Sequence, residues 1–148
     1  MTQLSSRKLI MRYLLILTLI FISSISLANK TNKYFLEGEK LFLANNFKKA
    51  KILFEKDIVF DTKNVNSYLY LSKIHQNLKN QIEEEKNLKT VLLLDPKNEE
   101  GLFLLTKLYL SEGDFKLAEK EYNLLKKVCK SFCNKLENLE LQILKFKK

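Results

Sequence analysis

Large side chains recur with a period of 34 residues from residue 31 onward. The sets that superpose under this shift are Tyr34, Tyr68 and Leu102; Leu41, His75 and Tyr109; Phe54, Leu88 and Tyr122; and Phe60, Leu94 and Val128. Registry at one period over three copies indicates internal repeats. The pattern therefore predicts three repeats, at residues 31–64, 65–98 and 99–132.

Each repeat is expected to form two antiparallel helices. Large residues at repeat positions 4, 7 and 11 lie at helical i, i+3 and i+7 spacing, as one apolar stripe requires. Small residues such as Ala50 and Ala118 let two helix axes approach closely, while Gly113 and Asp114 are typical of a turn and helix cap. With only 3 Gly and 1 Pro, the chain lacks the turn residues of a β-sandwich, so we expect an all-α fold.

The same register continues past the third repeat. Leu136, Leu139 and Ile143 occupy the positions of a further first helix, and lysine and glutamate fill its other face. No repeat follows, so residues 133–146 are predicted to form a capping helix that closes the stack.

These positions resemble the tetratricopeptide repeat (TPR) family over almost all of residues 29–148. The third repeat matches best, with Leu102, Leu105, Tyr109, Ala118 and Tyr122 at the family's characteristic positions. The first repeat has Glu37 where Leu is usual, and the second has Gln81 and Glu84 where an aromatic residue and Ala are usual. The resemblance implies a right-handed α-solenoid of three helix-turn-helix repeats plus a capping helix, and a role in protein binding.

The first 28 residues differ in kind from the repeats. Arg7, Lys8 and Arg12 precede an apolar run over residues 13–22, and Ser26 and Ala28 supply the small side chains of a cleavage site. This order predicts a secretory signal peptide, and hence export, to the periplasm of a bacterial-type envelope. The alternative is an uncleaved inner-membrane anchor facing the periplasm, although the charge-free stretch is shorter than the ~20 apolar residues that a span prefers.

The chain is basic, with a formal net charge of +9. The first 28 residues hold three of the 26 basic residues and none of the 17 acidic ones, so residues 29–148 keep a net charge of +6. The lysines are dispersed and the protein is expected to be exported, so no nucleic-acid partner is predicted. Weak attraction to anionic membrane surfaces is compatible with this charge.

Catalytic chemistry finds little support in the sequence. The single histidine, His75, stands at a core position of its repeat, more than one repeat before the cysteines, so a Cys/His site is not expected. No phosphate-binding loop or zinc-protease motif occurs. Glu83, Glu84 and Glu85 are interpreted as a solvated helix start. We therefore predict no enzyme activity, no catalytic residues, no metal site and no cofactor.

Cys129 and Cys133 are the only cysteines, and they lie where the third repeat meets the capping helix. A close pair in an exported protein favours a disulfide, and a bend can bring the two Cα atoms within the required ~4.4–6.8 Å. A redox-active pair, a metal site and free thiols are the alternatives. The spacing is not C-x-x-C and no further ligands accompany it.

The resemblance also implies a concave groove lined by the first helix of each repeat. The residues that fall on its groove positions are Phe35, Leu69 and Phe103; Glu39, Lys73 and Lys107; and Phe42, Gln76 and Leu110. An apolar line flanked by mixed charge suits an extended segment or helix of a partner protein. The alternative is that these apolar residues only complete the packing of a thin solenoid.

One known use of such grooves does not fit. The family's clamp for chaperone tails needs Lys and Asn where Phe35 and Glu39 stand, and basic residues where Glu100 and Leu104 stand. The predicted function is a non-enzymatic adaptor in the cell envelope that binds a peptide or helix, of undetermined oligomeric state. The alternatives are a membrane-anchored structural protein that self-associates and, less favoured, a thiol-redox or metal protein using Cys129 and Cys133.

Overall fold

The structure is a computed structural model that describes residues 11–14, 16–17 and 33–145. A helix over residues 33–43 is followed by α2 (Phe47–Phe60), α3 (Val65–Asn77), α4 (Gln81–Leu94), α5 (Glu99–Glu112), α6 (Phe115–Val128), a short 3₁₀ turn η1 (Cys133–Lys135) and α7 (Leu136–Lys145). These described ranges contain no β-strand.

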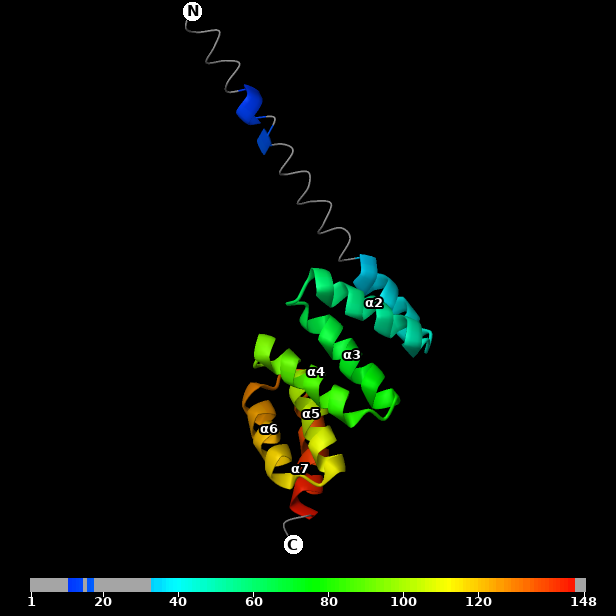
Figure 1. Ribbon diagram of the computed structural model, residues 1–148. Helices are drawn as coiled ribbons and strands as arrows, with labels where there is room; N and C mark the ends of the chain where they lie inside the picture. Colours follow the sequence, from blue (N-terminus) through cyan, green and yellow to red (C-terminus); the bar gives the residue numbers. More distant parts are fainter. Residues whose placement is uncertain (1–10, 15, 18–32, 146–148) are drawn as a thin grey trace, which may run out of the picture.

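The helices form successive antiparallel pairs. Residues 33–43 pair with α2, α3 with α4 and α5 with α6, and each pair packs against the next in chain order (Figure 1). Helix α7 packs on α5 and α6 and covers the end of the stack (Figure 1). The predicted fold class, an α-solenoid of three helix pairs with a closing helix, is confirmed.

The predicted leader, residues 1–28, lies mostly outside the described residues. Residues 11–14 and 16–17 are helical, and nothing more of this segment is described. Across the described ranges, none of the helices combines the length and the apolar character that crossing a bilayer needs.

The turn between the two helices of each pair has the same backbone conformation and the same kind of cap in all three repeats. Asn45, Lys79 and Gly113 stand in register, and all three have a positive φ, at 58°, 56° and 79°. Glycine and asparagine adopt this left-handed backbone most readily, and Lys79 adopts it in the second pair. The next residue in each turn then caps the second helix, with the side chains of Asn46, Asn80 and Asp114 accepting N–H hydrogen bonds.

Small residues bring the paired helices together, as expected. A Cβ added at Gly38 would lie only 3.0 Å from Cε1 of Phe54, so the first helix needs glycine there to meet α2. Ala50 and Ala118 are fully buried at the matching place on α2 and α6. The packing beneath them falls into two apolar clusters. The larger joins the second pair, the third pair and α7, and the smaller joins the first pair to α3.

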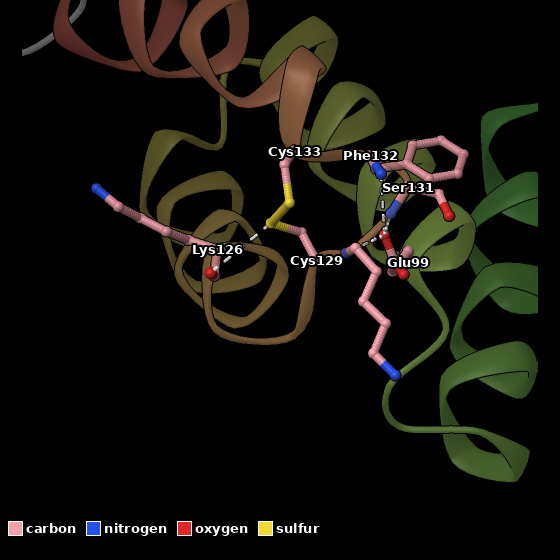
Figure 2. Close-up of a disulfide and its surroundings, with 7 residues drawn as sticks. Glu99, Lys126, Cys129, Ser131, Phe132 and Cys133 are labelled. Carbon is pink, nitrogen blue, oxygen red and sulfur yellow. Dashed lines mark hydrogen bonds between the residues drawn. A yellow bond between two sulfur atoms is a disulfide. The ribbon is translucent and has the colours of Figure 1, made fainter.

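A disulfide closes the segment between α6 and α7. Cys129 and Cys133 are bonded with their Cα atoms 5.3 Å apart, in agreement with the predicted pairing. The backbone N–H groups of Lys130, Ser131 and Phe132 all point at one oxygen of Glu99, at N···O distances of 2.8, 2.8 and 2.9 Å (Figure 2). The first turn of α5 therefore holds the disulfide loop in place.

Candidate binding face

The first helices of the three pairs share one face of the stack. An aromatic cluster lies on this face, and Tyr70 of α3 is at the centre of the cluster. We call this surface, on residues 33–43, α3 and α5, the first-helix face. The Tyr70 ring stacks on Phe54 at 4.8 Å between ring centroids. It also meets Phe42 and Phe35 edge-on, at 5.0 and 5.8 Å. Two predicted groove residues of the first repeat thus converge on one ring from the second.

Charged groups link this cluster to the third pair. The Tyr70 hydroxyl donates a hydrogen bond of 2.6 Å to Glu39, and the Lys73 ammonium lies 5.0 Å from the Tyr70 ring centroid. Lys73 also forms an ion pair of 2.7 Å with Glu100 of α5. Burial, reinforced by Glu39, raises the pKa of Tyr70 to about 12. Tyr70 is therefore a neutral donor at physiological pH.

The third-repeat end of the face carries a separate aromatic pair. Phe103 of α5 lies 5.5 Å from Phe132 of the disulfide loop, between ring centroids. Lys107 approaches the Phe103 ring at 5.6 Å, and Lys135 approaches both rings, at 4.7 and 4.4 Å. The loop thus covers part of the surface that Phe103 was expected to offer.

Leu69 and Leu110, two further predicted groove residues, belong to the core. They are only 6% and 9% exposed and pack in the larger apolar cluster. Their side chains support the face from beneath, because both pack into the cluster that joins α3 to the later helices. The predicted apolar line is thus interrupted between its two aromatic ends.

Gln76 and Glu84 form a polar pair beside the buried Leu108. The Gln76 amide donates a hydrogen bond of 3.0 Å to the Glu84 carboxyl, which is only 4% exposed. Burial raises the pKa of Glu84, and the Gln76 hydrogen bond offsets this in part. The interpretation of residues 83–85 as a solvated helix start is therefore wrong for Glu84, because its position in the repeat faces the partner helix.

An open pocket of about 420 Å³ lies at this polar pair. The residues that line it are Gln76, Lys79, Gln81, Glu84, Lys107, Leu108 and Ser111. The hollow lies between the α3–α4 helix pair and α5, and the predicted groove residues Gln76 and Lys107 place its rim on the first-helix face. A side chain of another molecule has room to enter it.

Two other buried polar residues lie away from this pocket. His75 is 6% exposed, as its core position predicted, and burial lowers its pKa, so it is neutral. Asp57 of α2 is fully buried and accepts hydrogen bonds from Ser67 and Asn64, at 2.6 and 2.7 Å. Among the described residues, no three His, Cys, Asp or Glu side chains are grouped so that they could hold a metal ion.

Tyr70 and Phe132 were missed as members of the face. Tyr70 stands one residue after a groove position, and a period of 34 alone does not show that its ring turns toward the neighbouring repeat. The Phe35 and Phe42 rings one repeat earlier were the available signal, since aromatic residues tend to pair. Phe132 reaches the face only through the bend of the disulfide loop.

Comparison with solved structures identifies the same fold in distant proteins. The type III secretion chaperone SycD of Yersinia enterocolitica, solved with a peptide of the translocator YopD, superposes with a TM-score of 0.73 at 14% identity, over 80% of this chain and 93% of that one. The TPR2B domain of yeast Sti1, from an Hsp70 complex, gives 0.73 at 12% identity, over 78% and 97%. PcrH of Pseudomonas aeruginosa gives 0.69 at 15% identity, over 81% and 93%.

These likenesses extend over nearly the whole length of the other chains, so the architecture is that of tetratricopeptide repeats. The identities are low enough that they establish the fold alone. No protein-family model and no curated relative matches the sequence.

Proposed function

We propose that this protein is a non-enzymatic interaction module that binds a peptide or helix of a partner protein along its first-helix face. The observation that carries the proposal is the half-buried aromatic cluster of Phe35, Phe42 and Tyr70, flanked by Glu39 and Lys73. Aromatic rings beside fixed charges supply both buried area and orientation to a bound segment.

The fold supports this proposal. SycD was solved with a translocator peptide, a TPR domain of RPAP3 (Spaghetti) with the HSP90 peptide SRMEEVD, and Sti1 TPR2B as an Hsp70 complex. Three different ligands in three proteins of one fold are consistent with a surface that the fold provides and each sequence adapts. For this chain, the kind of ligand is therefore inferred from the residues of the first-helix face.

A ligand that presents a carboxylate to a clamp of basic residues suits this face poorly. Glu39 and Glu100 stand on it, and the Lys73 ammonium is already paired with Glu100 at 2.7 Å. A carboxylate arriving there would meet like charge and a neutralised lysine. An internal segment with mixed charge is the better match, because Lys107 and Lys135 stand at the third-repeat end of the same face.

Site-specific photocrosslinking tests the proposal without destabilising the aromatic cluster. Residues 29–148 would be used to select binders from a displayed peptide library. A benzophenone amino acid would then replace Gln76 on the first-helix face or Lys86, whose side chain is 71% exposed on α4. We expect selected peptides to crosslink at position 76 and not at 86. Crosslinking at 86 alone, or binders that crosslink at neither position, would contradict the proposed face.

We further propose that the protein works outside the cytoplasm, in the cell envelope, after removal of residues 1–28. The basic, apolar and small-residue order of that segment supports this, and so does a disulfide between the two cysteines. The test is to express the full chain in a bacterium, isolate the protein from the periplasmic and membrane fractions, and sequence its N-terminus. A first residue of Asn29 is expected, and a retained leader would instead favour the anchored, self-associating alternative.

A further inference from the structure

The three repeats provide their own comparison for the polar pair of the second repeat. Two positions, one on the first helix and one on the second, face each other inside every helix pair. The residues that occupy them are Phe42 and Ala50, Gln76 and Glu84, and Leu110 and Ala118. Apolar residues fill these positions in the first and third repeats, and a hydrogen-bonded amide and carboxyl fill them in the second.

Packing does not require a carboxylate at this place. Ala50 and Ala118 are fully buried at the equivalent position, and a methyl group satisfies the close helix contact there. Burying a carboxyl costs free energy unless charge and hydrogen bonds compensate it. Glu84 is 4% exposed, and Gln76 is the one side-chain donor that the described residues give it. The substitution therefore adds a cost that the other two repeats avoid.

The neighbouring cations compensate this carboxyl only in part. No lysine of the described ranges comes within ion-pair distance, 4.0 Å, of Glu84, whereas Lys73, for example, is placed 2.7 Å from Glu100. The Lys107 ammonium is drawn to the Phe103 ring, at 5.6 Å from its centroid. Lys107 still lowers the pKa of Glu84 from beyond ion-pair distance, and Glu112 raises it. An acceptor thus remains at the 420 Å³ pocket, open to a donor from outside.

We propose that this pocket receives one basic side chain, lysine or arginine, of the partner segment, with Glu84 as its counter-ion. The inference rests on the proposed function, since the pocket lies between α3 and α5 on the first-helix face. Leu108 offers an apolar wall for the methylene stem, and Ser111 and Gln81 offer further acceptors for the charged head. Lys79 and Lys107 line the pocket as well, and Glu84 is its one carboxyl, which is too few for a metal ion.

The pocket can be tested apart from any partner with a small probe. Nα-acetyl-lysine amide and its uncharged isostere, Nα-acetyl-norleucine amide, would be titrated into ¹⁵N-labelled residues 29–148. We expect the lysine compound alone to shift the amide signals of residues 76–84 and 107–111. Charged hydrogen bonds contribute about 1.5–3 kcal/mol, so Glu84→Gln should weaken this binding about tenfold or more.

Glu83→Gln is the matched control, because Glu83 stands in the same helical turn and does not line the pocket. Its variant should bind the lysine compound as the wild type does. Circular dichroism and the melting temperature would verify that both variants are folded. An equal response to the norleucine compound, or unchanged binding by Glu84→Gln, would overturn the inference.

Peptides selected on the first-helix face provide the second arm. Each lysine or arginine in such a peptide would be replaced by norleucine. At one position the loss of affinity, about tenfold, should disappear in the Glu84→Gln background. Peptides that crosslink at position 76 without any such coupling would refute the pocket and leave the proposed function standing. Binding of the lysine compound without any face-binding peptide would support the pocket and count against the proposed function.

Discussion

Glu99 holds Ser131, a residue 32 positions away, through a hydrogen bond of 2.8 Å from the Ser131 backbone N–H to the Glu99 carboxylate. The same oxygen accepts the N–H groups on either side, so one side chain fixes the path of the disulfide loop. Backbone donors converging on an anion form a nest that favours a carboxylate over a neutral group. This contact is where the third helix pair meets the closing helix.

Glu99→Gln should lower the melting temperature by a few degrees at neutral pH. The three N–H donors lower the pKa of Glu99, with Lys130 contributing most. A lowered folded-state pKa stabilises the protein above the unfolded value, near 4.5, and the contribution is lost as pH falls through the folded value. Thermal melts from pH 3 to 7 would check this, with exposed Glu137→Gln as control. The wild type and the Glu99 variant should converge at the acid end, and a constant gap would contradict the prediction.

Removing the disulfide should destabilise the fold by about 2 kcal/mol, because the loop that it closes is short. The change is Cys129→Ser together with Cys133→Ser, and the measurement is urea unfolding. Reduced wild type should match the double variant, and reductant should leave the variant unchanged. Since the loop also holds Phe132 against Phe103, the variant should lose contacts beyond the loop itself. Unfolding curves that coincide for oxidised wild type and the variant would show that the disulfide does not stabilise the fold.

Asp57→Asn should remove a pH-dependent loss of stability. Burial raises the pKa of Asp57 despite hydrogen bonds from Ser67 and Asn64, and Asp61 raises it further. A raised folded-state pKa gives stability that is full below the unfolded value, near 3.8, and is lost as pH rises through the folded value. The variant should therefore gain on the wild type between pH 4 and 7. Urea unfolding at several pH values measures this, and parallel profiles would show that Asp57 stays ionised throughout.

Glu84→Ala should stabilise the protein by about 1 kcal/mol, the gain typical of restoring a favourable residue at such a position. It places in the second repeat the small residue that Ala50 and Ala118 supply elsewhere. Glu83→Ala in the same turn should give no such gain, because the other repeats have Lys49 and Leu117 at its position and no small residue is restored there. Urea unfolding of both variants provides the comparison. A loss of stability in Glu84→Ala would mean that the hydrogen bond from Gln76 stabilises the fold by more than burial of the carboxyl costs.

The sequence predicted the helix pairs because their determinants are local and repeated. The large residues at period 34 and the small ones at Ala50 and Ala118 specify which sides of the helices meet. The capping residues Asn46 and Asp114 add where the second helices begin. None of these features depends on contacts between distant parts of the chain.

The face was predicted less completely, since its details depend on packing between repeats. Leu69 and Leu110 fall on groove positions and are nevertheless buried, because exposure at a position depends on which neighbouring side chains pack against it. Glu84 lies in an acidic run that is typical of a solvated helix start, while the shift by one repeat, which aligns it with two alanines, carried the contrary signal. The contact of Glu99 with residues 130–132 depends on backbone direction, which no side-chain pattern encodes.

The two apolar clusters have a mechanical consequence. The larger extends over the second pair, the third pair and α7. The disulfide and Glu99 hold the loop between α6 and α7 at this end of the stack. The smaller joins the first pair to Leu71 and Ile74 of α3, and the buried Asp57 lies at the same junction. In a linear stack each pair is stabilised only by its neighbours, so opening starts where the adhesion is least. We therefore expect the described stack to open first at the helix over residues 33–43 and α2, the end without a disulfide. A ligand bound from Phe35 to the pocket at Glu84 would stabilise that end.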